Sequence, residues 1–301
     1  MSAVAPRLVL VTRATELEAL VARHGTREQA RFFLATRGQA MEEIEERHRV
    51  IEEAWRAVQA AIPLRWRRVR LDRSDLSRFV FEERDLVVAV GQDGLVANVA
   101  KYLSGQLVIG VNPDPARYDG VLARHAPKAA GALLPAVAEG EVRVAERCMV
   151  ETRVDDGQRL LALNEVFLGH RTHQSARYRL RLRDREERQS SSGVIVSTGT
   201  GATGWARSIH RERHSGIALP RPEEPRLAVF VREAWPSVAT GVELTDGELR
   251  AGETLELVSE MNEGGVLFGD GIEEDRIELR FGMRATVCIA PERLRLVEAA
   301  R

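Results

Sequence analysis

The sequence predicts an α/β plus all-β fold, in which an N-terminal parallel sheet with helices is followed by an antiparallel β domain. Short apolar runs at Arg67 to Leu71, Leu86 to Val90 and Leu107 to Val111 are separated by segments of helix length, which is typical of parallel strands joined by crossover connections. From about Val142 to Phe281 the hydrophobic period is two and turns recur at short intervals, which indicates antiparallel strands. The 301 residues give room for two domains.

The first part of the chain is expected to hold one strand and three helices. Leu8 to Val11 is apolar enough for a strand, and Thr15-Glu16-Leu17-Glu18 is a capping-box sequence that opens a helix ending near His24-Gly25. A second helix is expected from about Arg27 to Arg37. After Gly38 a long helix is predicted, with glutamates on one face and apolar residues on the other. We expect the apolar face to pack against the rest of the protein. A dimer or partner surface is the alternative. The apolar positions of this helix are Ile44, Ile51, Trp55, Val58 and Ile62.

Composition excludes several classes of function. Lys and Arg number 44 against 45 Asp and Glu, so the net charge is -1 and no global field attracts nucleic acid or an anionic membrane. Cys148 and Cys288 lie in strand-like apolar runs and are expected to be buried small side chains. The apolar run from Leu8 to Val11 is too short for a signal peptide or a membrane span, so we expect a cytoplasmic protein without nucleic-acid or membrane partners.

One later strand carries alternating arginines. The pattern Tyr178-Arg179-Leu180-Arg181-Leu182-Arg183, with Arg177 in the same register, places the arginines on one face because strand side chains alternate. We expect this face to be solvated. A phosphate-binding face or a subunit contact is the alternative.

The turn Gly91-Gln92-Asp93-Gly94 is the most informative stretch, because it joins the apolar run ending at Val90 to the helix-like segment Leu95 to Leu103. Glycines let the backbone turn sharply and let a ligand approach the main chain, while the helix offers N-terminal N–H groups to an anion such as phosphate. Asp93 and Asn112 would both lie beyond the carboxyl ends of parallel strands, where ligands of such sheets bind. A purely structural turn is the alternative.

Three later segments are also rich in polar turn residues. Asn164-Glu165 follows the apolar run Leu160 to Leu163, Asp270-Gly271 follows another, and the strand-like run from Gly193 continues into a loop of hydroxyls and glycines. The loop consists of Thr198, Gly199, Thr200, Gly201, Ala202, Thr203, Gly204 and Trp205. Each segment has a structural alternative: a strand-ending turn, a hairpin turn and a helix cap, respectively.

Other nucleotide- and metal-binding motifs are absent or out of context. No Gly-x-x-x-x-Gly-Lys-Ser/Thr loop and no Gly-x-Ser-x-Gly elbow occurs. Gly199-x-Gly201-x-x-Gly204 matches a dinucleotide fingerprint, but antiparallel strands precede it and the acids about 20 residues on lie in a proline loop, so a Rossmann dehydrogenase is disfavoured. His210 and His214 do not fit a zincin pattern, and no metal site is expected.

Taken in order, these segments resemble the NAD kinase family, which has a Gly-Gly-Asp-Gly turn, an Asn-Glu or Asn-Asp pair and a Ser-Thr-Pro-Thr-Gly-Ser-Thr-Ala-Tyr-like loop. Val108 to Asn112 and Gly265 to Gly271 resemble two further family segments. The resemblance implies three parts of the chain. They are an N-terminal α/β domain with an extra helical region over residues 1–138, a β-rich NAD-binding domain over 139–284, and a C-terminal segment, 285–301, that returns to the first domain.

The resemblance implies an ATP-dependent kinase that phosphorylates the 2′-hydroxyl of the adenosine ribose of NAD, with Mg²⁺ on the phosphates and polyphosphate as an alternative donor. Asp93 is the implied catalytic residue, which accepts or orients the hydroxyl proton. Asn164 and Glu165 are implied to hold the ribose hydroxyls and the adenine edge of NAD. The other implied nucleotide- or NAD-binding residues are Gly91, Gln92, Gly94, Asn112, Thr198, Gly199, Thr200, Gly201, Ala202, Thr203, Gly204, Trp205 and Asp270. A homodimer or homotetramer is also implied.

The sequence departs from the family pattern at several positions. Gln92 replaces a glycine, Leu95 a threonine, Gly199 a proline and Ala202 a serine, and Gly204-Trp205 replaces Ala-Tyr. These changes leave two alternatives open: a kinase of the same superfamily that acts on another metabolite or a lipid, and a catalytically weak sensor of NAD or NADP.

Overall fold

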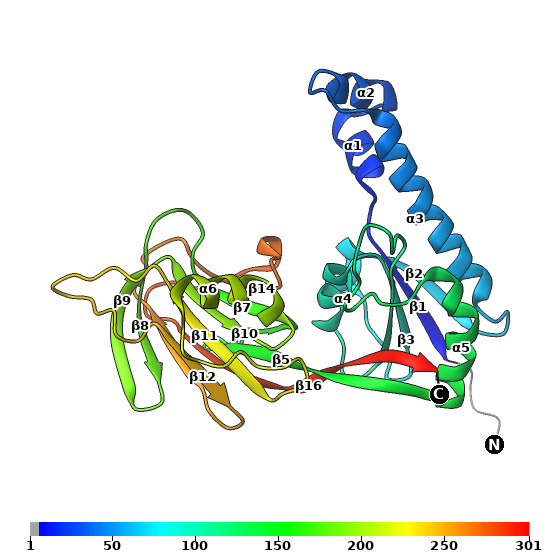
Figure 1. Cartoon of the computed structure of the whole chain (residues 1–301). Coiled ribbons are helices and arrows are strands. Elements are labelled where there is room, and N and C mark those ends of the chain that lie inside the picture. Colours follow the sequence, from blue (N-terminus) through cyan, green and yellow to red (C-terminus); the bar gives the residue numbers. More distant parts are fainter. Residues whose placement is uncertain (1–5, 301) are drawn as a thin grey trace. The chain divides into compact units, whose positions relative to one another are not determined.

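The computed structural model describes residues 6–300, and the chain forms two compact units (Figure 1). Of the described residues, unit 1 comprises 6–145 and 295–300, and unit 2 comprises 146–294. These boundaries lie beyond 138 and 284, where the sequence placed them, because strands β5 (Val142–Val154) and β16 (Arg284–Ala300) each run through both units. Within residues 6–300 we find no helix of the length and apolar character that crossing a bilayer requires.

Unit 1 contains the parallel sheet that the apolar runs predicted. Its strands follow the order β2-β1-β3-β4-β16, and every neighbouring pair is parallel. The strands besides β16 are β1 (Arg7–Thr12), β2 (Arg67–Asp72), β3 (Leu86–Val90) and β4 (Leu107–Val111). The helices are α1 (Glu16–His24), α2 (Arg27–Ala35), α3 (Met41–Ala61), η1 (Arg73–Arg78), α4 (Asp93–Ala100), η2 (Pro127–Ala129) and α5 (Ala130–Glu139).

The core of unit 1 explains why its strands are continuous apolar runs. All five residues of β3 are buried, since Trp55 and Val58 of α3 and Leu133 and Leu134 of α5 pack with the strands in one cluster. The predicted apolar face of α3 is therefore its packed face, as expected.

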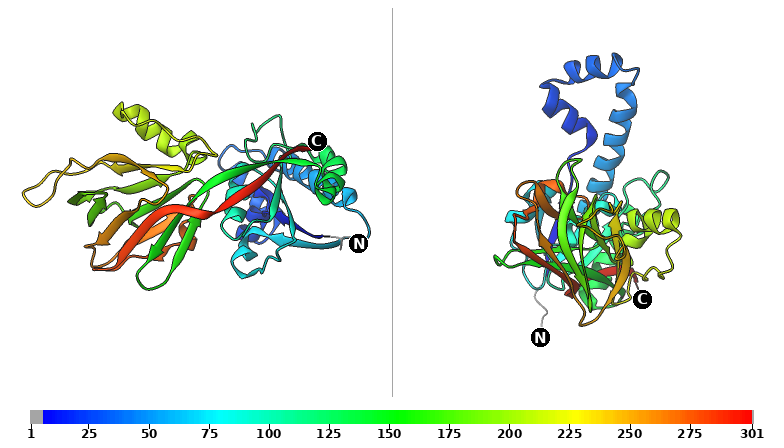
Figure 2. Two further views of the ribbon diagram at one scale, coloured as in Figure 1. Left: turned by 90° about the horizontal axis from the view of Figure 1, so that it is seen from below. Right: turned by 90° about the vertical axis from the view of Figure 1, so that its left-hand side faces the viewer.

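The extra helical region forms a small core of its own. Thr15 and Glu18 make both hydrogen bonds of the predicted capping box at the start of α1. Leu34 of α2 is buried with Met41 and Ile44 at the first turns of α3. Figures 1 and 2 show α1 and α2 gathered around this end of α3. The extra helical region thus has a small hydrophobic core of its own, separate from the core around the parallel sheet.

Unit 2 consists of antiparallel strands in two sheets, which confirms the predicted all-β part. One sheet has the strand order β12-β11-β10-β7-β14-β15. In the other sheet β13, β8 and β9 follow β16 in this order, and β5 pairs with both β16 and β6. Tyr178 and Leu180 of the second sheet and Leu168 and Leu227 of the first lie in one buried core. The remaining bounds are β6 (Arg159–Ala162), β7 (Glu165–His170), β8 (Ala176–Leu182), β9 (Arg185–Ser191), β10 (Gly193–Ser197), η3 (Gly201–Thr203), α6 (Trp205–Arg213), β11 (Arg226–Arg232), β12 (Asp246–Arg250), β13 (Leu255–Ser259), β14 (Gly265–Gly269), η4 (Glu273–Asp275) and β15 (Ile277–Glu278).

The alternating arginines of β8 lie on an exposed face, as predicted. Arg179, Arg181 and, just beyond the strand, Arg183 pair with glutamates on or beside β13, at 3.7, 2.8 and 2.8 Å. Exposed pairs of this kind contribute little stability each, about 0–1 kcal/mol. The arginines are therefore occupied by cross-strand ion pairs.

The two cysteines are both free thiols. Cys148 is fully buried in the core of unit 2, as expected for a small apolar side chain. Cys288 is only half-buried, so the expectation of burial was wrong there. Its thiol lies 3.9 Å from the Glu151 carboxylate, a polar neighbour that a strand-like apolar pattern cannot reveal.

Candidate functional site

The predicted site residues fall into two groups, one in each unit. Gly91 to Gly94 and Asn112 belong to unit 1, whereas Asn164, Glu165, the loop from Thr198 to Trp205 and Asp270 belong to unit 2. Each group is described within its own unit.

The glycine turn of unit 1 leads directly into α4. Helix α4 begins at Asp93 and ends at Ala100, so the expected span Leu95 to Leu103 was wrong by two to three residues at each end. Gln92 has extended backbone angles and is the N-cap, which makes the acid the first helical residue rather than a turn residue before the helix. The Gly91 N–H donates to Val111 O at 2.9 Å, which ties the turn to the end of β4.

The carboxylate of Asp93 is held by the backbone of a neighbouring loop. Its Oδ2 accepts the Val121 N–H at 2.9 Å, and its Oδ1 accepts the N–H groups of Leu122 and Ala123 at 2.9 and 2.8 Å. A carboxylate offers about four lone-pair positions, so about one remains open, on Oδ2. Asp93 thus fixes the loop as well as offering an acceptor.

The loop between residues 112 and 125 is built around two further residues. Asn112 is buried, and its carboxamide donates to Tyr118 O at 2.7 Å and accepts the Asp114 N–H at 3.0 Å. A Cβ on Gly110 would lie 2.2 Å from the carbonyl oxygen of Leu122, so only glycine lets the loop approach β4. In this structure Asn112, predicted to bind nucleotide, uses both ends of its side chain to hold the loop.

A cavity of about 470 Å³ lies beside the glycine turn in unit 1. The turn contributes Gly91, Gln92 and Gly94 to its lining. The extra helical region and η1 contribute basic side chains that the sequence reasoning missed, because they belong to no motif: Arg13, Arg47, His48 and Arg73. Asp93 is not among the lining residues, since its carboxylate faces the loop.

The predicted site residues of unit 2 lie at one end of three neighbouring strands of the six-stranded sheet. Strands β10, β7 and β14 are neighbours there, with Ser197 opposite Glu165 and Gly269 opposite Val166. The end of β10, the start of β7 and the end of β14 therefore lie side by side. Asn164-Glu165, the hydroxyl loop and Asp270 therefore lie next to one another. Residues that are predicted to form one site must do so.

Asp270 joins two of these segments. It has a positive φ of 55°, and its carboxylate accepts the N–H groups of Leu163 and Asn164 at 3.0 and 2.7 Å. Its own N–H donates to Glu165 O at 3.0 Å. An aspartate tolerates left-handed backbone better than most residues and can hold a facing turn through its carboxylate. Asp270 therefore fixes the backbone that presents the Asn-Glu pair.

The hydroxyls of the loop differ in what they contact. Thr198 is fully buried, donates to Leu163 O at 2.5 Å and accepts the N–H groups of Thr200 and Gly201 at 3.1 and 3.3 Å. The Thr203 hydroxyl donates to Thr200 O at 3.0 Å. The Thr200 hydroxyl is buried and has no hydrogen-bond partner among the described residues. Of these three threonine hydroxyls, only that of Thr200 makes no hydrogen bond within residues 6–300.

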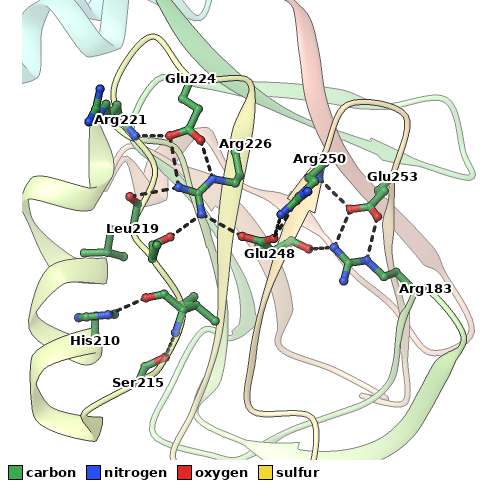
Figure 3. Close-up of polar contacts among 12 residues, drawn as sticks. Arg183, His210, Ser215, Leu219, Arg221, Glu224, Arg226, Glu248, Arg250 and Glu253 are labelled. Carbon is green, nitrogen blue, oxygen red and sulfur yellow. Dashed lines mark hydrogen bonds and ion pairs between the residues drawn. The ribbon is translucent and has the colours of Figure 1, made fainter.

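Two glycines of the loop are required by close backbone approach. A Cβ on Gly201 would lie 2.2 Å from Asn164 O, and one on Gly199 would lie 2.0 Å from Arg221 O. Figure 3 shows how Arg226 anchors the segment that approaches Gly199: its guanidinium donates to Leu219 O at 3.3 Å and pairs with Glu224 and Glu248, both at 2.9 Å. Gly199 is thus a packing requirement of this fold.

Trp205 and Ala202, two positions that depart from the family loop, serve packing, whereas Gly204 does not. Trp205 is the first residue of α6, and its ring stacks on Phe167 with centroids 6.0 Å apart. The Arg232 guanidinium lies 5.1 Å above the same ring. Ala202 is buried, whereas a Cβ on Gly204 would meet only one atom, at 3.8 Å.

The pKa of Glu165 is raised to about 7. Burial is the main cause because it disfavours the charged carboxylate, and the negative charge of Asp270 adds to it. A carboxyl group with this pKa changes charge near neutral pH. It can therefore be neutral without ligand and become an acceptor when hydroxyl donors arrive.

Comparison with known proteins places the chain among NAD kinases. No family model matches the chain. It is 32% identical to the NAD kinase of Nitratidesulfovibrio vulgaris over 220 residues, which cover 64% of this chain and 75% of that protein. It is 27% identical to the mitochondrial NAD kinase 2 of Rattus norvegicus, over 75% of this chain and 73% of that protein.

Solved structures show the same fold. An NAD kinase from Archaeoglobus fulgidus in complex with ATP matches with a TM-score of 0.59 and 19% identity, over 97% of this chain and 93% of that one. The yeast NADH kinase complexed with NADH matches with a TM-score of 0.59 and 15% identity, over 98% and 84%. The two-part architecture is therefore a known one.

Proposed function

Because the chain belongs to the NAD kinase family, we propose that it transfers the terminal phosphoryl group of ATP to the 2′-hydroxyl of the adenosine ribose of NAD(H), giving NADP(H). The relation to the bacterial NAD kinase carries this proposal. The hydroxyl oxygen bonds to the terminal phosphorus, the bond to the bridging oxygen breaks, and ADP leaves with that electron pair. The hydroxyl proton passes to an acceptor on the protein.

Asp93 is the proposed acceptor or orienting group for that proton. Phosphoryl transfer requires mainly alignment and charge neutralisation, so a single fixed carboxylate suffices. Three backbone N–H groups fix this carboxylate, and the open lone pair on Oδ2 is the atom available to a hydroxyl. Gly91, Gln92 and Gly94 give the nucleotide access to the main chain beside it.

The pair Asn164-Glu165 is the proposed holder of the NAD ribose. An ionised Glu165 accepts hydrogen bonds from hydroxyls, and the Asn164 carboxamide both donates and accepts, which suits an adenine edge. Thr200 adds a hydroxyl without a partner among residues 6–300. Asp270 acts through the backbone of the pair rather than on the ligand itself.

We propose that the metal ion of the reaction is bound by the phosphates of the nucleotide and not by a cluster of protein side chains. Among the described residues no group of three or more His, Cys, Asp or Glu side chains could hold a metal ion. Mg²⁺ is commonly bound through substrate phosphates. When bound to ATP it neutralises charge on the transferred phosphoryl group. We assign no residue of this chain to the ion.

The test is formation of NADP from NAD by the purified protein with Mg·ATP, with NADH in a parallel reaction. Turnover that requires ATP supports the kinase, and the ratio of the two rates identifies the preferred acceptor. One observation favours a second candidate function, a sensor of NAD or NADP: three of about four acceptor positions of Asp93 are occupied. Tight NAD binding without turnover on any nucleotide would establish the sensor instead.

Oligomeric state and location complete the proposal. The family resemblance implies a homodimer or homotetramer. Size-exclusion chromatography with light scattering would distinguish these from a monomer. A cytoplasmic location stays a prediction from the sequence.

A further inference from the structure

One loop of unit 2 packs directly against the hydroxyl loop, residues 198–205, and no role has been given to it. This proline loop, residues 220–225, contains three prolines. A Cβ on Gly199 would lie 2.0 Å from Arg221 O and 2.5 Å from Pro222 N, so the two backbones are in contact. The proline loop therefore limits where Gly199 can lie.

The hydroxyl loop lacks a constraint of its own at this contact. Gly199 stands where the family pattern has a proline, and the contact leaves no room for a proline ring. Proline fixes its own φ angle, whereas glycine restrains the backbone less than any other residue. The hydroxyl loop of this chain therefore depends on the proline loop for a constraint that its own sequence does not supply.

Arg226, the first residue of β11, anchors the proline loop (Figure 3). Its side chain is only 14% exposed, and its guanidinium donates to Leu219 O, just before the loop, at 3.3 Å. The same guanidinium pairs with Glu224 inside the loop and with Glu248 of β12, both at 2.9 Å. A planar guanidinium holds several acceptors in fixed directions. Arg226 thus ties the proline loop to the six-stranded sheet.

A chain of contacts leads from Arg226 to the hydroxyl loop. Glu224 receives Arg226 and also accepts the Arg221 N–H at 3.0 Å, so the position of Arg221 depends on that of Arg226. Arg221 presents its carbonyl oxygen to Gly199. Gly199 is followed by Thr200, whose buried hydroxyl has no hydrogen-bond partner within residues 6–300. A shift of Arg221 would therefore move the backbone that carries the proposed NAD contact.

Strand β5 provides a second anchor for the proline loop. The Cys148 N–H donates to Pro222 O at 2.9 Å, and Arg147 pairs with Glu223 at 2.7 Å. Neither contact involves Arg226. Loss of Arg226 should therefore loosen the proline loop without detaching it from unit 2.

We propose that Arg226 is a positioning residue for NAD binding, which acts through Glu224 and the proline loop on the backbone at Gly199. The inference rests on the proposed function insofar as the hydroxyl loop holds NAD. Arg226 contributes no group to the ligand. It limits the positions that the hydroxyl loop, and with it Thr200, can take before NAD arrives. A loop that is already in place loses less entropy on binding, so the affinity for NAD rises.

Hydrogen exchange tests the positioning itself. The N–H groups of Ala202 and Gly204 donate to Thr198 O and Gly201 O at 2.9 and 3.0 Å, so their exchange reports how often the hydroxyl loop opens. Arg226→Gln should raise these exchange rates about tenfold, whereas the amides of β8 and β13 should keep wild-type rates. Arg226→Lys keeps the charge but not the planar set of donors, and its rates should lie between the two.

The matched control is Arg250→Gln. Arg250 donates to the same Glu248 at 2.7 Å, but among the described residues it makes no hydrogen bond or ion pair with the proline loop (Figure 3). The control should exchange its amides and bind NAD like the wild type. Equal effects of Arg226→Gln and Arg250→Gln would mean that loss of any partner of Glu248 loosens the loop, and would overturn the role of Arg226.

Calorimetry with NAD tests the consequence for the ligand. Arg226→Gln and Gly199→Ala disturb the contact from its two sides, and each should raise the Kd for NAD about tenfold. The double variant should bind no more weakly than the weaker single variant, because both changes break the same contact. In the kinase reaction the KM for NAD should rise while the KM for ATP stays unchanged, a split that a general loss of structure would not produce.

The outcomes separate this proposal from the proposed function. Losses that add in the double variant, or an NAD Kd of Arg226→Gln equal to that of the wild type, would overturn the role of Arg226 even if NADP is formed. Wild-type protein that binds NAD without forming NADP would contradict the kinase. The same binding constants would then still decide whether Arg226 positions the hydroxyl loop, because they do not depend on catalysis.

Discussion

Two carboxylates, Asp93 in unit 1 and Glu165 in unit 2, occupy opposite electrostatic environments. Asp93 accepts three backbone N–H groups from one loop, at 2.8 to 2.9 Å. Glu165 is half-buried beside a second carboxylate, and both effects raise its pKa to about 7. The first is held in place by three backbone donors, whereas burial and the charge of Asp270 disfavour the charged form of the second.

The difference indicates which ligand groups each carboxylate can serve. Asp93 has about one lone-pair position left and a fixed orientation, which suits the positioning of one hydroxyl. Glu165, whose pKa is about 7, is only partly ionised at neutral pH, and hydroxyl donors would favour its ionised form, which suits a ribose diol that brings two. The fixed acid is the proposed catalytic group, and the acid with the raised pKa is the proposed binding group.

Asp93→Asn should have the largest effect. Loss of the proton acceptor is expected to lower kcat by about 10²–10⁴-fold. The new amide would also place an N–H donor against a backbone N–H of the loop, which destabilises the protein by about 1–3 kcal/mol. Measurements of kcat and of thermal unfolding on the same preparation would show both effects.

A second variant separates chemistry from loop disorder. In Gly110→Ala the new Cβ lies 2.2 Å from Leu122 O, so the loop must shift while the Asp93 carboxylate stays intact. Asp119→Asn, in the same loop, is the exposed control. If Gly110→Ala loses as much kcat as Asp93→Asn, Asp93 is a structural residue and its proposed catalytic role is wrong.

Residue type and order sufficed to predict much of this molecule. The buried runs of β3 and β4 and the capping box at Thr15 were readable because hydrophobic periodicity and helix caps are local signals. The partners of Asp93 were not readable, since they are backbone N–H groups that carry no residue signature. The arginines of the cavity were missed because Arg13 and Arg73 meet only through the tertiary fold.

Glu165→Gln should change the pH dependence of stability. The folded-state pKa of about 7 lies above the ordinary value of 4.5, so the folded protein binds the extra proton in this window. The contribution of Glu165 is therefore most favourable below pH 4.5 and is lost as the pH rises to about 7, by up to about 3 kcal/mol. Urea unfolding of wild type and Glu165→Gln from pH 4.5 to 8 should show the variant gaining relative stability.

The control for this titration is Glu263→Gln, an exposed glutamate in the same unit. Its stability should follow that of the wild type at every pH. A difference between wild type and Glu165→Gln that stays constant from pH 4.5 to 8 would contradict the raised pKa.

The same carboxyl group should make NAD binding depend on pH. Only the ionised form accepts two hydroxyl hydrogens, so the KM for NAD should fall as the pH rises from 6 to 8. Glu165→Gln should have a KM about tenfold or more above that of the wild type at pH 8, since a charge-assisted contact is lost, and a nearly flat pH profile. A KM for ATP that follows the same profile would show that the effect does not belong to the NAD site.

Thr200→Val should have the smallest effect, and its sign is informative. The Thr200 hydroxyl is buried without a partner among the described residues, so replacing it by an isosteric methyl group should stabilise the free protein by about 1 kcal/mol. The same change should raise the KM for NAD a few-fold, because the hydroxyl is reserved for the ligand. Thr198→Val is the contrasting variant: its hydroxyl makes bonds to Leu163, Thr200 and Gly201, so it should destabilise the protein. If Thr200→Val stabilises the protein and leaves the KM unchanged, the hydroxyl has no ligand, and the donors that Glu165 awaits must come from NAD alone.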